Sequence, residues 1–111
     1  MKHQINFNNL EQHIDYAADF LTALANNKRL LILNKLLHNE MSVGVLAKEV
    51  NLSQSALSQH LAKLRAMNLV STRRDAQTIY YMVSSPHIET MLSTLAGIHQ
   101  VPEHQRVAAF A

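Results

Sequence analysis

Apolar residues recur with the period of an α-helix between Leu52 and Leu69, in the segment LSQSALSQHLAKLRAMNL. At about 100° per residue, Leu57, Leu61 and Leu64 fall on one narrow stripe, which predicts a helix packed against a core along that stripe. The opposite arc carries short or amide-bearing side chains and no carboxylate, whereas a solvated helix face is usually rich in Glu, Lys and Arg. We interpret this arc as a surface presented to a partner. It consists of Gln54, Ser55, Ser58, Gln59 and Ala62.

A first helix is predicted from Asn9 to about Ala25. Its apolar residues recur at alternating intervals of four and three, which is the spacing of a coiled-coil seam. The seam can pack within its own domain or face a second subunit, and we favour the second subunit. The seam residues are Leu10, Ile14, Ala17, Leu21 and Leu24.

Two short helices precede the presented helix. One is predicted from Lys28 to His38, capped by Asn26-Asn27, and the next from Val43 to Val50, capped by Ser42. Arg29 opposes the dipole of its own helix, so we expect either a phosphate or carboxylate partner or a plain surface arginine. Only Asn51-Leu52 separates the second of these helices from the helix that Ser53 caps, which is the plan of a helix-turn-helix.

After Asn68, the runs LVSTRR and TIYYMV are rich in β-branched and aromatic residues and flank Asp75-Ala76-Gln77. This pattern predicts a β-hairpin that forms a wing beside the helix-turn-helix. A last helix is predicted from Pro86 to His99, because Ser85 is a good N-cap and proline fits the first helical position. Its apolar positions are Ile88, Met91, Leu92, Leu95 and Ile98.

The expected fold is therefore mainly α with a small β-hairpin, a winged helix-turn-helix in the order α-α-α-α-β-β-α that dimerises through its first and last helices. We expect one domain over residues 9–99, a flexible N-terminus over residues 1–8 and a flexible tail over residues 100–111. The expected dimer interface consists of Leu10, Ile14, Leu21, Leu24, Leu92, Leu95 and Ile98.

Composition excludes several classes of function. The 111 residues include no cysteine, which removes disulfides, thiolate metal sites and thiol redox switches. The N-terminus lacks the apolar segment of a signal peptide, and no apolar run approaches the ~20 residues that would span a bilayer, so we expect a cytoplasmic protein with no membrane contact. We find no nucleophile with a base, no paired carboxylates and no glycine-rich phosphate loop, so we do not expect an enzyme.

Charge is distributed unevenly along the chain. The net charge is only +2, but no Asp or Glu occurs from Val50 to Arg74. A basic segment of this kind is typical of proteins that bind a polyanion, because each phosphate that is neutralised releases counterions. Together with the Ser/Gln face of the presented helix, it leads us to expect double-stranded DNA as the partner. The alternative is a winged helix that serves as a protein-interaction module, which would lack steep salt dependence of duplex binding. The predicted DNA-contacting residues are Gln54, Ser55, Ser58, Gln59, Lys63, Arg65, Arg73, Arg74 and Gln77.

These residues divide by chemistry. The amides of Gln54 and Gln59 can pair with adenine edges, and the hydroxyls of Ser55 and Ser58 are short enough for base edges or phosphate. The cations that flank the presented helix and the hairpin turn are expected to meet phosphates. These are Lys63, Arg65, Arg73 and Arg74.

The segments ALANNKRLLIL, SVGVLAKEVNLSQSALSQHLAKLRAMNLV and STRRDAQTIYY resemble the ArsR/SmtB family of winged-helix repressors over roughly residues 20–85. The resemblance implies a homodimer that binds an inverted-repeat operator, with the helix after Asn51 in the major groove. We expect a repressor, because a bare winged-helix dimer has little surface left for activating a polymerase.

The family's sensor sites are mostly absent from this chain. Ser42-Val43-Gly44 stands where metal-sensing members carry a Cys-x-Cys pair, and Asn34 stands at a cysteine position of the thiol-switch branch. Of the zinc ligands on the last helix only His87 matches, because Ser85, Ile98 and Val101 occupy the other positions and His99 is one residue out of register. We therefore expect neither a metal site nor a cofactor.

Overall fold

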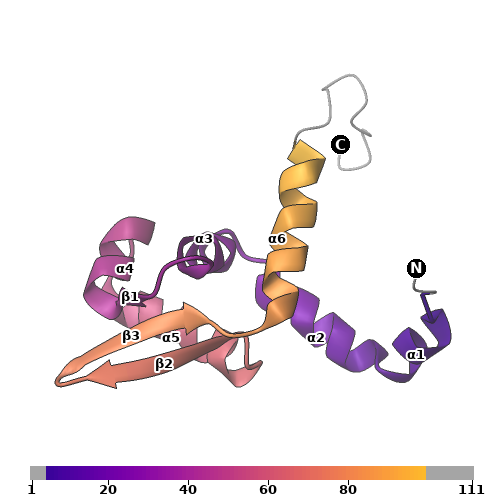
Figure 1. The fold of residues 1–111 in the computed structure, drawn as a ribbon, viewed down its shortest axis with the longest axis horizontal. Coiled ribbons are helices and arrows are strands. Elements are labelled where there is room, and N and C mark those ends of the chain that lie inside the picture. The colour runs from indigo at the N-terminus through magenta and orange to yellow at the C-terminus, as the bar shows by residue number, and fades with distance from the viewer. Residues whose placement is uncertain (1–4, 100–111) are drawn as a thin grey trace.

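Our computed structural model describes residues 5–99, and its elements follow the winged helix-turn-helix order (Figure 1). The prediction of a mainly α winged helix-turn-helix with a small β-hairpin is confirmed. The tail over residues 100–111 and residues 1–4 of the predicted flexible N-terminus lie outside the described residues. The elements are α1 (Phe7–Gln12), α2 (Ile14–Leu24), α3 (Asn27–Leu36), β1 (Met41–Ser42), α4 (Val43–Val50), α5 (Gln54–Ala66), β2 (Val70–Asp75), β3 (Thr78–Val83) and α6 (Pro86–His99).

The predicted caps start the helices of the helix-turn-helix. The Asn26 side chain accepts hydrogen bonds from the backbone amides of Lys28 and Arg29, both at 3.0 Å. Ser42 and Ser53 accept in the same way from residues three positions on, at 3.3 and 3.1 Å. Each bond satisfies an amide of the first turn that has no partner within its own helix, which explains why the helices begin at these residues.

The N-terminal helix differs from the prediction of one continuous helix from Asn9 to Ala25. The chain forms two helices, α1 and α2, that break at His13, where φ is −123°. No proline or glycine marks the break in the sequence. Helix α1 starts at Phe7, because the Asn6 side chain accepts from the Asn9 amide at 3.0 Å, and it contributes no buried residue to the core.

The sheet has three strands in the order β1-β3-β2, so the predicted hairpin gains a third, very short strand. Met41 pairs with Tyr81 and Ser42 with Tyr80. Two residues are too few for a hydrophobic period, which is why the sequence pattern does not reveal β1. Strand β3 therefore lies in the middle of the sheet, with β1 on one side and β2 on the other.

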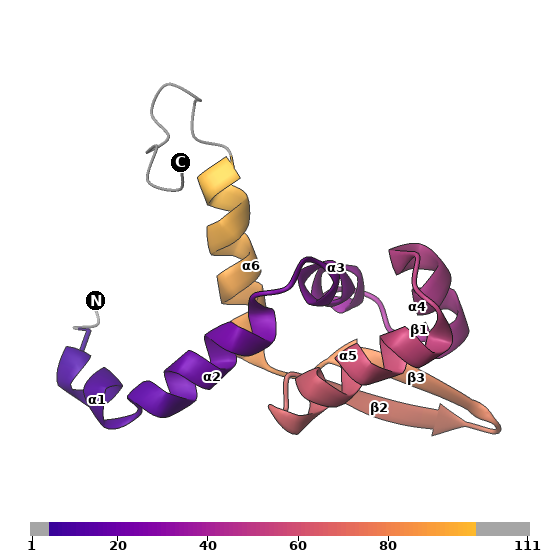
Figure 2. The same ribbon diagram turned by 180° about the vertical axis from the view of Figure 1, so that it is seen from behind.

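The core lies where α3, α4, α5, the sheet and the start of α6 meet. The predicted stripe of α5 is confirmed, since Leu57, Leu61 and Leu64 are almost completely buried. Ile88 of α6 and Ala23 and Leu24 at the end of α2 belong to the same cluster, and Met91 and Leu92 of α6 pack against it. Beyond these residues, α6 on one hand and α1 with most of α2 on the other project away from the core in different directions (Figures 1 and 2). Within the described part of the chain, every helix is too short or too polar to cross a lipid bilayer.

Candidate nucleic-acid interface

Helix α5 presents the surface that the sequence pattern indicates. Its buried stripe fixes the helix against the core, and the opposite face is open to solvent. The predicted α5 residues Gln54, Ser55, Ser58, Gln59, Lys63 and Arg65 are all exposed. Lys63 and Arg65 lie in the last turn, where positive charge also interacts favourably with the helix dipole.

The start of α5 and the turn of the hairpin line the same surface groove. This groove has a volume of about 360 Å³, and both Gln54 and Gln77 line it. Gly44 of α4 lies against Gln54, since a Cβ atom built on Gly44 would be 3.9 Å from the Gln54 Nε2 atom. The remaining lining residues are Ser42, Val43, Gly44, Thr78 and Ile79, none of which sequence reasoning placed in the site.

The hairpin turn is tight. Asp75 pairs with Thr78, which leaves Ala76 and Gln77 as the two turn residues. Ala76 has φ of 56°, a left-handed conformation that costs an L-residue energy. Arg74 pairs with Ile79 of the neighbouring strand, so the two side chains project from the same face of the hairpin. Ile79 shares its face of β3 with Tyr81 and Val83, which pack against the core, so Arg74 lies on the side of the sheet that faces the core and α5.

Arg73 lies on the opposite face of β2 and is already engaged. Its Nε donates to Glu40 Oε2 at 3.2 Å and its Nη2 donates to Glu40 Oε1, which makes a two-pronged ion pair. The guanidinium also lies over the Tyr80 ring, 4.6 Å from the centroid. These hydrogen bonds lower the pKa of Glu40 and raise the pKa of Arg73. Sequence reasoning missed Glu40, because its closeness to Arg73 depends on the unpredicted strand β1.

Arg29 is not a plain surface arginine. Its side chain is buried, with 8% of its surface exposed, and among residues 5–99 it forms no ion pair with a carboxylate. Its Nε donates to the Ala23 carbonyl at 2.6 Å and its Nη2 to the Thr22 carbonyl at 3.1 Å. Arg29 therefore caps the C-terminal turn of α2, where carbonyl groups have no partner within the helix.

His60 lies at the edge of the α5 stripe, close to the start of α3. Burial, followed by the positive charges of Arg29, Lys63 and Lys28, lowers the pKa of His60 below its ordinary value. The ring therefore favours its neutral form, in which it adds nothing to the positive charge of the presented surface.

The predicted dimer residues are mostly exposed in the protomer. Ile14 and Leu21 of α2 and Ile98 of α6 are each more than half exposed, and Leu10 of α1 is also exposed. Leu92 and Leu95 are half-buried. Leu24 differs, because only 5% of its surface is exposed and it packs into the core of its own protomer.

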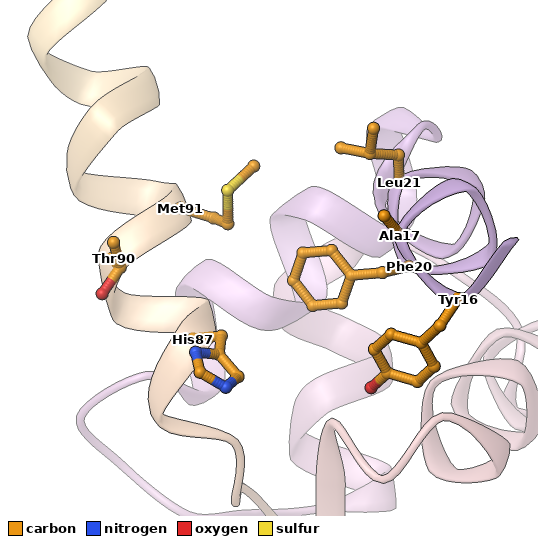
Figure 3. Close-up of a pocket in the computed structure, with 7 residues that line it drawn as sticks. All are labelled: Tyr16, Ala17, Phe20, Leu21, His87, Thr90 and Met91. Carbon is orange, nitrogen blue, oxygen red and sulfur yellow. The ribbon is translucent and has the colours of Figure 1, made fainter. Parts of the chain in front are cut away.

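Between α2 and α6 lies an apolar groove of about 390 Å³ (Figure 3). Phe20 and Leu21 of α2 and Met91 of α6 line it, together with His87, the one residue that matches the zinc-ligand pattern of the last helix. Among residues 5–99, no three side chains of the metal-ligating types come close enough together to hold an ion.

Comparison with known proteins gives consistent matches. Residues 26–72 match the model of the bacterial regulatory protein family arsR. The nodulation protein NolR of Rhizobium meliloti is 63% identical over 91 residues, which cover 80% of this chain and 75% of that protein. The transcriptional activator HlyU of Vibrio cholerae is 48% identical over 95 residues, covering 86% of this chain and 88% of that protein.

A solved structure has the same arrangement. The crystal structure of NolR from Sinorhizobium fredii aligns with a TM-score of 0.78 and 54% identity, and the alignment covers 92% of this chain and 100% of that chain. The sequence segments that resemble the ArsR family also indicate a particular similarity to NolR and HlyU. The identities to these two proteins confirm that similarity.

Proposed function

Because the chain belongs to the arsR family of bacterial regulatory proteins, we propose that it is a transcriptional regulator that binds an inverted-repeat DNA operator as a homodimer and represses transcription. The observation that carries this proposal is the exposed face of α5, on which amides and hydroxyls are presented without a carboxylate. Such a helix can read base edges in the major groove. A regulator of bacterial transcription acts in the cytoplasm, where the DNA lies.

We assign the residues of this surface to two roles. Gln54, Ser55, Ser58 and Gln59 are proposed to read bases, since they lie at the start and along the exposed face of α5. Lys63, Arg65 and Arg74 are proposed to contact phosphates, and Gln77 is proposed to approach the DNA from the hairpin turn. Arg73 is left out of this set, because its charge is already paired with Glu40.

The experiment begins with selection of bound fragments from genomic DNA, followed by binding assays on the selected operator and on a scrambled duplex. Replacing Gln54 or Gln59 by alanine is expected to cost about 1–3 kcal/mol on the operator and little on the scrambled duplex. Gln12→Ala is the matched control, because Gln12 is an exposed glutamine on α1, away from α5. Equal losses on both duplexes would show that this face does not read sequence.

The dimer is supported by exposed apolar side chains on α1, α2 and α6. Large exposed apolar patches on a small protein usually mark an interface. We propose that Leu10, Ile14, Leu21, Leu92, Leu95 and Ile98 bury one another across a two-fold axis, while Leu24 stays in the protomer core. The assembled dimer would place its two α5 helices about 34 Å apart, one turn of DNA.

Sedimentation measures this directly. We expect a dimer at micromolar concentration, and Leu21→Glu should dissociate it, because each subunit would bury an unpaired charge in the interface. Val45→Glu is the control, since Val45 is about as exposed as Leu21 but lies on α4. A monomer that binds a single half-site tightly would contradict the dimer.

A further inference from the structure

Two adjacent arginines of β2 have different surroundings. Arg74 has no carboxylate within ion-pair distance among residues 5–99, whereas Arg73 holds both oxygens of Glu40. Successive residues of a strand point to opposite faces, so the two guanidinium groups leave β2 in opposite directions. The two residues are identical in type, so the sequence does not distinguish them, but their contacts in the structure differ.

The arrangement around Arg73 crosses the whole sheet. Arg73 and Ser42 both pair with Tyr80 of the central strand, one from each side, so these three residues form one row. Glu40 comes two residues before Ser42, and its carboxylate reaches over the central strand to the guanidinium that lies on the Tyr80 ring. The two oxygens of a carboxylate can accept two parallel N–H bonds from a guanidinium, as two oxygens of a phosphate can.

From this arrangement we propose that Glu40 is a positioning residue that gives the two arginines of β2 different roles in DNA binding. Glu40 pairs with Arg73 and keeps it on the face of the sheet opposite to Arg74, so that Arg74 alone supplies the phosphate contact of β2. This inference rests on the proposed DNA-binding function and adds a role for a residue that the DNA-binding face does not include.

Removing the carboxylate should leave the Arg73 guanidinium without its ion-pair partner and so make it available as an additional cation for the DNA backbone. Removing an acidic residue then strengthens binding to any duplex, while removing Arg73 itself changes little, because its charge is already neutralised.

The test is a salt series of duplex affinity for variants of the full chain that each remove one charge. Each phosphate contact contributes about −0.9 to the slope of log K against log salt. Glu40→Gln is expected to steepen the slope by about 0.9 and to tighten binding to operator and scrambled duplex about fivefold at 0.15 M salt. Arg74→Gln is expected to flatten the slope by about 0.9, and Arg73→Gln to leave it unchanged.

Two controls separate this mechanism from a general charge effect. Glu49→Gln removes the same charge from the exposed pair of Glu49 with Lys35, 3.3 Å apart, which is formed by α4 and α3 rather than by the wing. It should change the slope by less than half as much as Glu40→Gln. In the Arg73→Gln background, Glu40→Gln should no longer steepen the slope, because there is no cation to release.

A DNA-free measurement keeps the inference distinct from the proposed function. In the free wild-type protein the Arg73 Nε–H should give a slowly exchanging NMR signal that is lost in Glu40→Gln. If wild-type protein shows no salt-dependent duplex binding, the proposed function fails, whatever the state of the pair. If binding is salt-dependent but Arg73→Gln flattens the slope as much as Arg74→Gln, or Glu40→Gln does not steepen it, the division of roles is wrong.

Discussion

Replacing Arg29 by methionine tests how α2 is attached to the rest of the protomer. Methionine preserves much of the apolar stem that the 8% exposed side chain buries, but it removes both donors to the carbonyls of Ala23 and Thr22. Hydrogen bonds from a charged group contribute about 1.5–3 kcal/mol each, and burial of the guanidinium offsets part of that gain. We expect a loss of about 2–4 kcal/mol in the free energy of unfolding.

The assay is urea denaturation at one fixed protein concentration, because dimerisation would itself add to the apparent stability. Arg29→Lys retains the charge without the planar fork and should recover only part of the loss. Lys28→Met is a graded comparison, since Lys28 donates a single 2.7 Å bond to the Val50 carbonyl at the end of α4. It should cost about 1.5 kcal/mol, the low end of the range for a bond from a charged group, because this bond is only partly buried.

A second measurement follows from the position of α2. Because α2 carries Ile14 and Leu21, loosening its C-terminal turn should also weaken the proposed dimer. An Arg29→Met variant that unfolds within about 0.5 kcal/mol of wild type, with an unchanged denaturant slope, would show that the two bonds contribute nothing beyond burial of the stem.

Three further outcomes are expected. Stability should fall as the pH drops from above 6.5, the ordinary pKa of His60, through its lowered pKa in the folded state, because the unfolded chain binds the proton more readily. The variant His60→Gln should flatten this part of the pH profile of thermal unfolding. Ala76→Gly should raise stability by about 1 kcal/mol in denaturant titrations, because glycine adopts the positive φ without strain; a loss would indicate that the turn tolerates alanine freely. One equivalent of zinc per subunit should not release operator DNA in a binding assay, and a tenfold weakening would contradict the absence of a metal switch.

Sequence periodicity predicted the elements that bury a regular stripe. Leu57, Leu61 and Leu64 repeat at helical spacing, so both the existence and the orientation of α5 could be predicted, and the serine and asparagine caps marked where helices begin. The exposed face of α5 followed from the same pattern, because fixing one side of a helix fixes the other.

Features that depend on tertiary contacts could not be predicted in this way. The break at His13 has no proline or glycine signal, and β1 has only two residues. The partner of Arg29 is a pair of backbone carbonyls, which side-chain chemistry does not indicate. The partner of Arg73 is separated from it by 33 residues and reaches it only once β1 pairs with β3.

Ser42 serves two elements at once. Its backbone pairs with Tyr80 of β3, and its hydroxyl accepts from the Val45 amide and so begins α4. Because no residue separates the strand from the helix, no hinge lies between the wing and α4. The distance between the wing and α4 is therefore fixed. Relatives built on this plan would therefore have to change operator preference by exchanging side chains or lengthening the hairpin, since re-aiming the wing would also displace the first turn of α4.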